Sequence, residues 1–148
     1  MKSLIMLLSF TLAYSLTASA ASVECSIATR PSSYGCTNSN PFEECKSEFS
    51  KPIKLLVSEN QGWQETITTG FKFQINFMND GYKLPTIKIY VWDEKSFSFR
   101  ADEALNEALY QLNVVSGKNN FTTHGFTGLV YVYHPTTKAE MQYWCIQK

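Results

Sequence analysis

The side chains with the clearest chemistry are four cysteines, Cys25, Cys36, Cys45 and Cys145. No two of them form a C-x-x-C pair, so their spacing argues against a redox motif or a zinc ribbon. An even number of cysteines in an exported chain instead indicates two disulfides, for which three pairings exist. We favour Cys36 with Cys45 and Cys25 with Cys145. The alternative that joins Cys25 to Cys36 and Cys45 to Cys145 stays open.

The first 20 residues indicate that the chain is exported. Met1-Lys2-Ser3 is a short basic start, residues 4–16 are mostly apolar, and Ala18-Ser19-Ala20 is a small-x-small cleavage site. These three regions are typical of a secretory signal peptide. The apolar run is shorter than the roughly 20 residues that a membrane-spanning helix needs. The sequence therefore predicts a signal peptide over residues 1–20 and a secreted or periplasmic protein with no membrane span.

The other candidates for catalysis or metal binding do not converge. His124 and His134 are the only histidines, and no H-x-H or H-x-x-x-H spacing accompanies them, so no metal site is predicted. A G-x-S-x-G nucleophile turn and the glycine-rich phosphate loops are absent from the sequence. Asp93 or Glu94 could pair with Glu65 or Asp80 as glycosidase carboxylates, but Asp93-Glu94 is a predicted hairpin tip and Asp80 precedes a turn glycine, where solvated charges are expected. We therefore expect no catalytic residues, no cofactor and no enzyme activity.

The charge balance argues against two classes of partner. The sequence has 13 basic and 13 acidic side chains, and removal of Lys2 with the signal peptide leaves a formal charge of −1. Proteins that bind nucleic acid usually present a basic face or stripe. We therefore predict no nucleic-acid partner and no electrostatic binding to anionic lipid.

Aromatic residues make up 14% of the sequence and are the best candidates for binding. Tyr90 and Trp92 alternate with apolar residues on one predicted strand, and Tyr131, Tyr133 and Trp144 come from a predicted C-terminal hairpin. Their rings bury a large area at little entropic cost and keep a polar group, which both sugar rings and protein partners exploit. The competing interpretation is that these rings only pack within the fold.

The alternation of apolar residues predicts the strands that position these rings. Apolar and polar residues alternate over residues 71–77 and again over residues 86–92, and a loop rich in turn formers separates the two runs. This pattern is typical of an antiparallel pair of strands. If the isoleucines of the second run face the core, Tyr90 and Trp92 face away from it. The same outward face then holds Lys88, Gln74 and Asn76.

The rest of the chain completes a mainly β protein. Residues 21–50 lack sustained periodicity, so we expect an irregular, disulfide-linked N-terminal cover, followed by an antiparallel β domain over residues 51–148. One short helix is predicted from Asp102 to Leu112 by its helical spacing of apolar residues, with a strand through Tyr110, Leu112 and Val114 as the alternative. About 7–8 strands with turns between them predict an antiparallel β-barrel or β-sandwich.

These patterns leave several classes of binding protein open. The leading hypothesis is an exported, non-enzymatic domain that binds a polysaccharide or protein at the cell surface through an aromatic strand face. The alternatives are a secreted inhibitor or envelope structural protein that acts through its loops, and a carrier of a small lipophile. The sequon Asn120-Phe121-Thr122 would accept a glycan in a eukaryotic secretory pathway, and glycosylation of Asn120 stays open.

Overall fold

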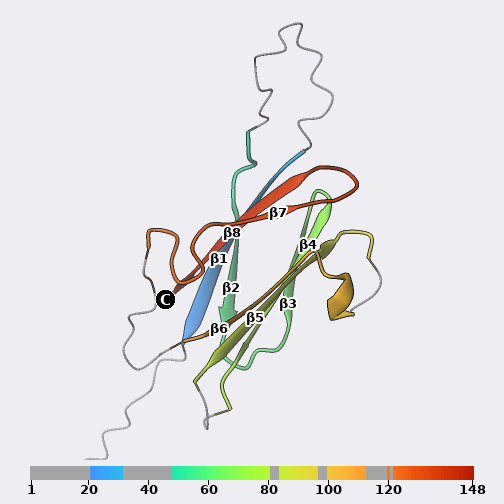
Figure 1. The fold of residues 1–148 in the computed structure, drawn as a ribbon. Coiled ribbons are helices and arrows are strands. Elements are labelled where there is room, and N and C mark those ends of the chain that lie inside the picture. The colour runs from blue at the N-terminus through green and yellow to red at the C-terminus, as the bar shows by residue number, and fades with distance from the viewer. Residues whose placement is uncertain (1–20, 32–47, 81–83, 97–99, 113–119, 121) are drawn as a thin grey trace, which may run out of the picture.

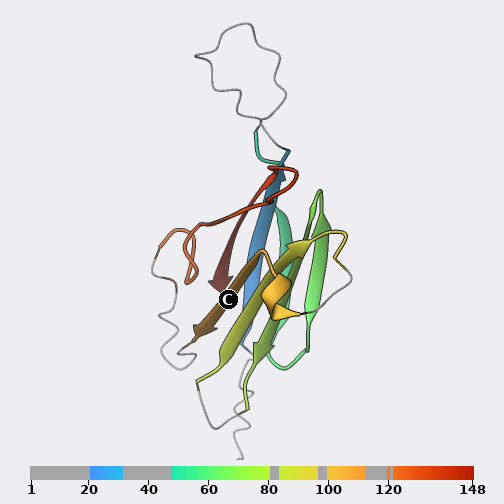
Figure 2. The ribbon, with the colours of Figure 1, turned by 45° about the vertical axis from the view of Figure 1, so that its right-hand side comes forward.

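The structure, a computed structural model, describes residues 21–31, 48–80, 84–96, 100–112, 120 and 122–148. Within these residues, eight strands form two four-stranded antiparallel sheets (Figures 1 and 2). Sheet A has the strand order β2-β1-β8-β7, and sheet B has the order β3-β4-β5-β6. The strands are Ser22–Arg30 (β1), Ile53–Ser58 (β2), Gln64–Thr68 (β3), Phe71–Met78 (β4), Thr86–Asp93 (β5), Asn106–Gln111 (β6), Val130–Tyr133 (β7) and Glu140–Gln147 (β8).

The strand order follows the chain around the molecule. In the described residues, strands adjacent in sequence also pair in space, except at two seams, between β2 and β3 and between β6 and β7. The first and last strands, β1 and β8, pair with each other. This is the connectivity of an up-and-down barrel opened along two lines, so the two sheets form a sandwich-like stack instead of a closed barrel. The predicted mainly β fold is confirmed.

The core lies between the two sheets. Phe71, Phe73, Ile75 and Phe77 of β4 are fully buried there, as the alternation of residues 71–77 predicted. Each such side chain contributes roughly 1.5 to 3 kcal/mol to folding. The ring of Phe73 meets that of Tyr143 in β8 edge to face, with the ring centroids 5.1 Å apart. These four side chains, on which the alternative of a lipophile carrier rests, are therefore packed against the opposite sheet.

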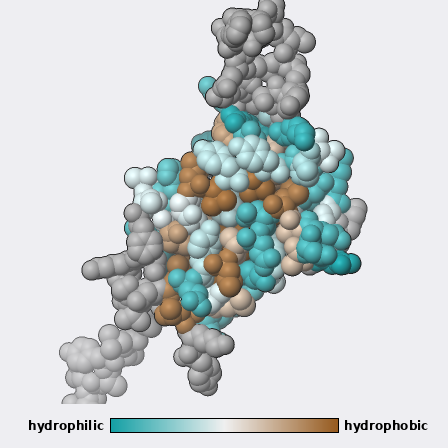
Figure 3. Space-filling model, in the orientation of Figure 1, coloured by the Kyte–Doolittle hydropathy of each residue, from teal (hydrophilic) through white to brown (hydrophobic). Residues whose placement is uncertain are grey.

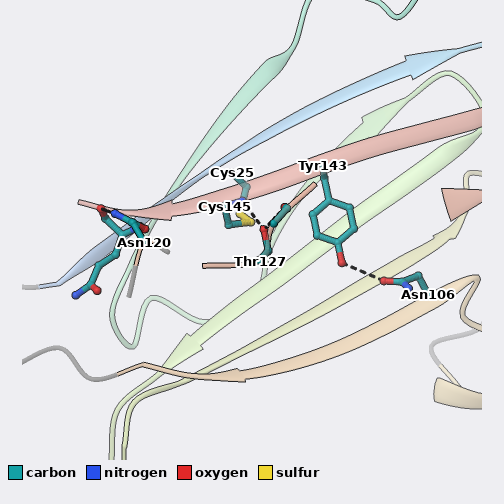
Figure 4. Close-up of a disulfide and its surroundings, with 8 residues drawn as sticks. Cys25, Asn106, Asn120, Thr127, Tyr143 and Cys145 are labelled. Carbon is teal, nitrogen blue, oxygen red and sulfur yellow. Dashed lines mark hydrogen bonds between the residues drawn. A yellow bond between two sulfur atoms is a disulfide. The ribbon is translucent and has the colours of Figure 1, made fainter. Parts of the chain in front are cut away.

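Tyr143 also makes a polar link across the core. Its hydroxyl donates a hydrogen bond to Asn106 Oδ1 in β6 over 3.1 Å (Figure 4). Burial raises the pKa of Tyr143 far above its ordinary value, so the phenol stays neutral and keeps the proton that it donates. A buried hydroxyl without a partner would be costly, so this bond favours one alignment of the two sheets.

The disulfide Cys25–Cys145 joins β1 to β8 in the middle of sheet A (Figure 4). The two residues lie directly opposite each other in the strand pair, and their Cα atoms are 4.0 Å apart. Both side chains are fully buried. The pairing favoured from the sequence is confirmed for Cys25 and Cys145. Cys36 and Cys45 lie outside the described residues, so a disulfide between them stays a prediction.

The prediction of an irregular cover over residues 21–50 is wrong for its first part. Residues 22–30 form β1, which lies inside sheet A between β2 and β8. Val23, Cys25 and Ile27 face the core and alternate with the polar Glu24 and Ser26. This alternation covers only five residues and ends at Ala28, an apolar residue that is buried on the outer face, so it is too short to predict the whole strand.

The predicted helix from Asp102 to Leu112 is also wrong. Ala101–Glu103 form a single 3-10 turn, and Asn106–Gln111 form β6, an edge strand paired with β5. Tyr110 packs against the core and Leu109 is exposed, which is the period of a strand, so the alternative strand is confirmed at Tyr110. Leu112 is buried just after the end of β6, and Val114 lies outside the described residues. A short isolated helix is marginal, whereas this strand gains a ladder of hydrogen bonds to β5. Among the described residues, no helix is long and apolar enough to cross a membrane.

Residues 122–128 run along the end of β8 and reach toward sheet B. The Phe126 N–H donates to the Cys145 carbonyl over 3.1 Å, and the Cys145 N–H donates to Thr127 Oγ1 over 2.9 Å. The Phe126 ring meets that of Tyr110 in β6 edge to face at 5.4 Å. Gly125 has a φ of +71°, and a Cβ at this position would overlap with the Cys145 carbonyl oxygen. Only glycine therefore fits this crossing.

A buried histidine links the sheets at the other end of β8. Nδ1 of His134 accepts hydrogen bonds from the backbone N–H groups of Thr136 and Thr137, at 3.2 and 3.1 Å. The proton of the neutral ring therefore lies on Nε2, which faces Asp93 Oδ2 at the end of β5 across 3.1 Å. The Lys95 N–H, and then His134, lower the pKa of Asp93 below its ordinary value of 3.8.

Loss of the disulfide should weaken the whole fold. We expect the double variant Cys25→Ala/Cys145→Ala to lower the free energy of unfolding by about 4 to 5 kcal/mol, because the bond closes a very long loop in the unfolded chain. Urea denaturation followed by tryptophan fluorescence measures this difference. A loss below about 1 kcal/mol would contradict a dominant role for the β1–β8 crosslink.

Replacement of Asp93 should change the dependence of stability on pH. Because the folded pKa of Asp93 is lowered, its ionised form stabilises the fold above pH 3.8, and this contribution is lost as the pH falls through the lower folded value. We expect Asp93→Asn to be less stable than the parent at pH 7 and to approach it in acid, as measured by urea denaturation at each pH. Asp102→Asn is the matched control, since it alters an exposed pair with Arg100. Equal effects of both substitutions would contradict the link to His134.

Candidate functional site

The outer face of sheet B carries a shallow cavity lined by three aromatic rings and an amide. Trp63, Tyr90, Trp92 and Gln74 enclose a volume of about 410 Å³, which we call the aromatic groove. The ring centroids of Trp63 and Tyr90 are 5.6 Å apart, and those of Tyr90 and Trp92 are 5.2 Å apart. The volume lies within the range of about 300 to 1,000 Å³ that is usual for ligand sites.

Strand register places these residues side by side. Gln74 of β4 lies opposite Tyr90 of β5, and on its other side it lies opposite Glu65 of β3. Side chains directly opposite each other on one face of a sheet are close enough to interact. The prediction that Tyr90 and Trp92 face away from the core, beside the polar residues of β4, is confirmed.

Trp63 reaches the groove by leaning across β4. It directly precedes β3, which is separated from β5 by the whole width of β4, about 10 Å. The 5.6 Å between the Trp63 and Tyr90 rings shows that both rings tilt over β4. Asn76 projects from β4 on this same face, two residues after Gln74, and its Oδ1 is buried without a hydrogen bond from the described residues.

A chain of hydrogen bonds fixes the base of the aromatic groove. The indole N–H of Trp92 donates to Gln74 Oε1 over 2.8 Å, and Gln74 Nε2 donates to Glu65 Oε2 over 3.0 Å. Trp92 is only 2% exposed and Tyr90 8%, whereas Trp63 is 48% exposed. Tyr90 and Trp92 therefore form the base of the groove, and Trp63 presents the accessible ring.

Tyr90 is held by a charged pair at the other side of the groove. Its hydroxyl donates to Glu107 Oε1 in β6 over 3.1 Å. Lys88 Nζ lies 3.3 Å from the same oxygen and 4.9 Å from the centroid of the Tyr90 ring. Interaction with Tyr90, and then with Glu107, raises the pKa of Lys88, so its ammonium group is charged at neutral pH. The positive charge over the ring adds a cation–π contact.

The other three predicted binding residues lie on the opposite side of the molecule. Tyr131 and Tyr133 of β7 project from the outer face of sheet A, where they are 47% and 63% exposed. Trp144 of β8 lies on the same face, and its ring meets that of His124 edge to face at 5.6 Å. The five aromatic residues selected from the sequence are therefore divided between two faces by the core. Figure 3 shows hydrophobic and hydrophilic residues interspersed over one view of the molecule.

Trp63 is the site residue that the sequence did not single out. The sequence does place Trp63 on the same face as Glu65 and Ile67, because the three residues stand at every second position of the strand that precedes β4. What the sequence lacked was the tilt of the ring across β4, which depends on contacts with Tyr90.

Two other kinds of site are less well supported by the described residues. A larger and more open hollow of about 510 Å³ lies where the edges of β2 and β3 meet, and the described residues that line it include no aromatic ring. In the part of the chain that the structure describes, no three His, Cys, Asp or Glu side chains gather to hold a metal ion. Of these two hollows, the aromatic groove is the one whose described lining combines aromatic rings with hydrogen-bonding groups.

Comparison of the chain with protein-family models, with curated proteins and with solved structures finds no match.

Trp92 should matter for stability more than Trp63 does. Trp92→Phe removes the N–H that satisfies the buried Gln74 amide oxygen, so we expect a loss of about 1 to 3 kcal/mol in the free energy of unfolding. Trp63→Phe makes the same chemical change at a half-exposed ring and should cost less than about 0.5 kcal/mol. Urea denaturation of both variants tests this contrast, and equal losses would contradict the assignment of Trp92 to the base of the groove.

Proposed function

We propose that the protein is an exported, non-catalytic binding domain that holds a neutral polysaccharide chain against the aromatic groove. The observation that carries the proposal is the half-exposed ring of Trp63 beside Tyr90, with the carboxylates of Glu65 and Glu107 on either side. A sugar ring offers an apolar face that can stack on an indole and hydroxyl groups that donate to carboxylates. The groove has both kinds of partner.

The polar groups around the groove favour a hydroxyl-rich ligand. Glu65 and Glu107 each accept a hydrogen bond from inside the groove, and a carboxylate has about four acceptor positions. Further donors can therefore bind at both carboxylates. Asn76 lies on the same face of β4, and its buried Oδ1 accepts no hydrogen bond from the described residues, so a ligand hydroxyl that reached it would satisfy it.

The charge of the site supports a neutral ligand over a charged one. Lys88 is paired with Glu107, and Glu65 is bonded to the Gln74 amide. The sequence as a whole has equal numbers of acidic and basic side chains. Long-range attraction of a polyanion or a polycation would require a surface of one sign.

The size of the groove supports a chain of sugars over a folded protein. A stable protein interface covers about 800 Å² on each partner, more than a cavity lined by four side chains provides. The outer face of sheet A, with Tyr131 and Tyr133 exposed, is the surface that a protein partner would use. Export is supported by the predicted signal peptide and by the Cys25–Cys145 disulfide, which is typical of an oxidising compartment.

A single substitution on each face separates these possibilities. We expect Trp63→Ala to raise the Kd for a neutral polysaccharide at least tenfold, which corresponds to about 1.4 kcal/mol, because the accessible ring is lost. Tyr133→Ala is the matched control, since it removes an exposed aromatic ring from the opposite sheet. Affinity electrophoresis in gels containing a β-glucan, an α-glucan or a galactomannan provides the measurement, and circular dichroism verifies the fold of each variant.

Three results would count against the proposal. Retarded migration that survives Trp63→Ala but not Tyr133→Ala would move recognition to the outer face of sheet A. Equal retardation of both variants would move it to the loops. The absence of retardation in all three gels would remove neutral polysaccharides as the ligand class.

A further inference from the structure

Two asparagine side chains close the ends of strands by pairing with one backbone residue each. Asn60 Oδ1 accepts from the Asn79 N–H over 2.8 Å, and Asn60 Nδ2 donates to the Asn79 carbonyl over 2.8 Å, just past the end of β4. The side-chain amide of Asn120 makes the same two hydrogen bonds with the backbone of Gln147, the last residue of β8. We call each arrangement an amide clasp. In each clasp a side-chain amide takes the place of a neighbouring strand.

The clasp at Asn120 uses one particular hydrogen of the amide group. Asn120 Oδ1 accepts from the Gln147 N–H over 2.9 Å, and Asn120 Nδ2 donates to the Gln147 carbonyl over 3.0 Å (Figure 4). The N–H and C=O of one residue in a strand point to the same side, so both ends of the side-chain amide must face them together. The donated hydrogen is therefore the one on the Oδ1 side of Nδ2.

Asn120 is also the acceptor of the sequon Asn120-Phe121-Thr122. An N-linked glycan converts the Asn amide into a secondary amide, which strongly prefers the trans form. In the trans form the substituent on nitrogen lies on the same side as the oxygen. The sugar carbon would therefore take the place of the hydrogen that Asn120 donates to Gln147.

The strand that Asn120 clasps is itself fixed by its pairing with β1. Gln147 lies opposite Val23, the Lys148 N–H donates to the Ser22 carbonyl over 2.9 Å, and Cys145 is two residues away. Because the end of β8 is held there by the disulfide and the strand pair, Asn120 meets a fixed partner once the sheet is complete.

We infer that the Asn120 clasp and an N-linked glycan at Asn120 exclude each other, so that Asn120 is a glycosylation site open only before the end of β8 pairs with β1. In the folded, oxidised domain, the hydrogen bond to Gln147 blocks glycosylation of Asn120 Nδ2. A glycan installed earlier leaves Gln147 without its clasp. This inference is independent of the aromatic groove.

Glycosylation of the purified protein in two states tests the inference. The folded, disulfide-bonded protein and the same chain after reduction and unfolding are each incubated with oligosaccharyltransferase and a lipid-linked oligosaccharide donor, and intact mass gives the rate of modification. We expect the folded protein to be modified at least tenfold more slowly. Thr122→Ala, which destroys the sequon, is the blank for the mass measurement.

A variant that opens the clasp without altering the sequon is the matched control. Gln147→Pro removes the N–H that donates to Asn120 Oδ1 and leaves Asn120, Phe121 and Thr122 unchanged. We expect the folded Gln147→Pro protein to be modified at least fivefold faster than the folded parent. If this variant does not fold, hydrogen exchange at the Gln147 amide gives the second measurement. It should show at least tenfold less protection in parent protein that was glycosylated and then refolded.

Three outcomes would overturn the inference. The first is equal modification rates for the folded and unfolded parent. The second is a glycosylated, refolded protein in which the Gln147 amide keeps its full protection. The third is failure of the unfolded chain to accept the oligosaccharide, because the sequon would then not be an acceptor in any state.

Discussion

The antiparallel pairing of β1 with β8 is the constraint on which the rest of the structure depends. These strands come from opposite ends of the described chain, and the cysteines that join them are 120 residues apart in sequence. Closing so long a loop has a large entropic cost, and the Cys25–Cys145 disulfide lowers that cost by restricting the unfolded chain. Among the described strands, β2 pairs with β1 alone, and β7 pairs with β8 alone. Without the central pair, sheet A would therefore divide into two hairpin-sized pieces, which are marginal on their own.

Sheet B depends on this closure even though its own connections are local. Its four strands follow one another in sequence, but β4 presents a row of phenylalanines that must be covered. Sheet A supplies that cover through Tyr143, and the Tyr143–Asn106 and His134–Asp93 bonds fix the alignment of the two layers. The aromatic groove lies on the other surface of the same strands. The disulfide therefore supports the groove through the core without contacting it.

Alternation in the sequence predicted β4 and β5, but it did not predict β1 or decide between a helix and a strand at β6. β4 and β5 were evident because one face of each is uniformly apolar, and the outward direction of Tyr90 and Trp92 followed from that phase. β1 was not predicted because its alternation covers only Val23 to Ile27 and ends at Ala28, an apolar residue on the outer face. The helix prediction failed because the apolar residues with helical spacing fall on both faces of β6: Ala108 packs against the core and Leu109 is exposed, an arrangement fixed by pairing with β5. Division of the aromatic residues between two faces required the strand order, which no local pattern contains.

The hydrogen bonds within the groove determine what a ligand can gain there. Trp92 is fixed through Gln74 to Glu65, and Tyr90 is fixed through Glu107 to Lys88. These rings keep their positions before a ligand arrives, so little conformational entropy remains to be lost when one binds. The same bonds occupy the Trp92 N–H and the Tyr90 hydroxyl hydrogen, and both rings are buried, so the accessible ring face is that of Trp63. Affinity for the proposed ligand must then come from stacking on Trp63 and from donors that the ligand brings to the carboxylates. A chain of sugar rings brings both, whereas a purely apolar ligand would leave the carboxylates at the edge of the groove without new partners.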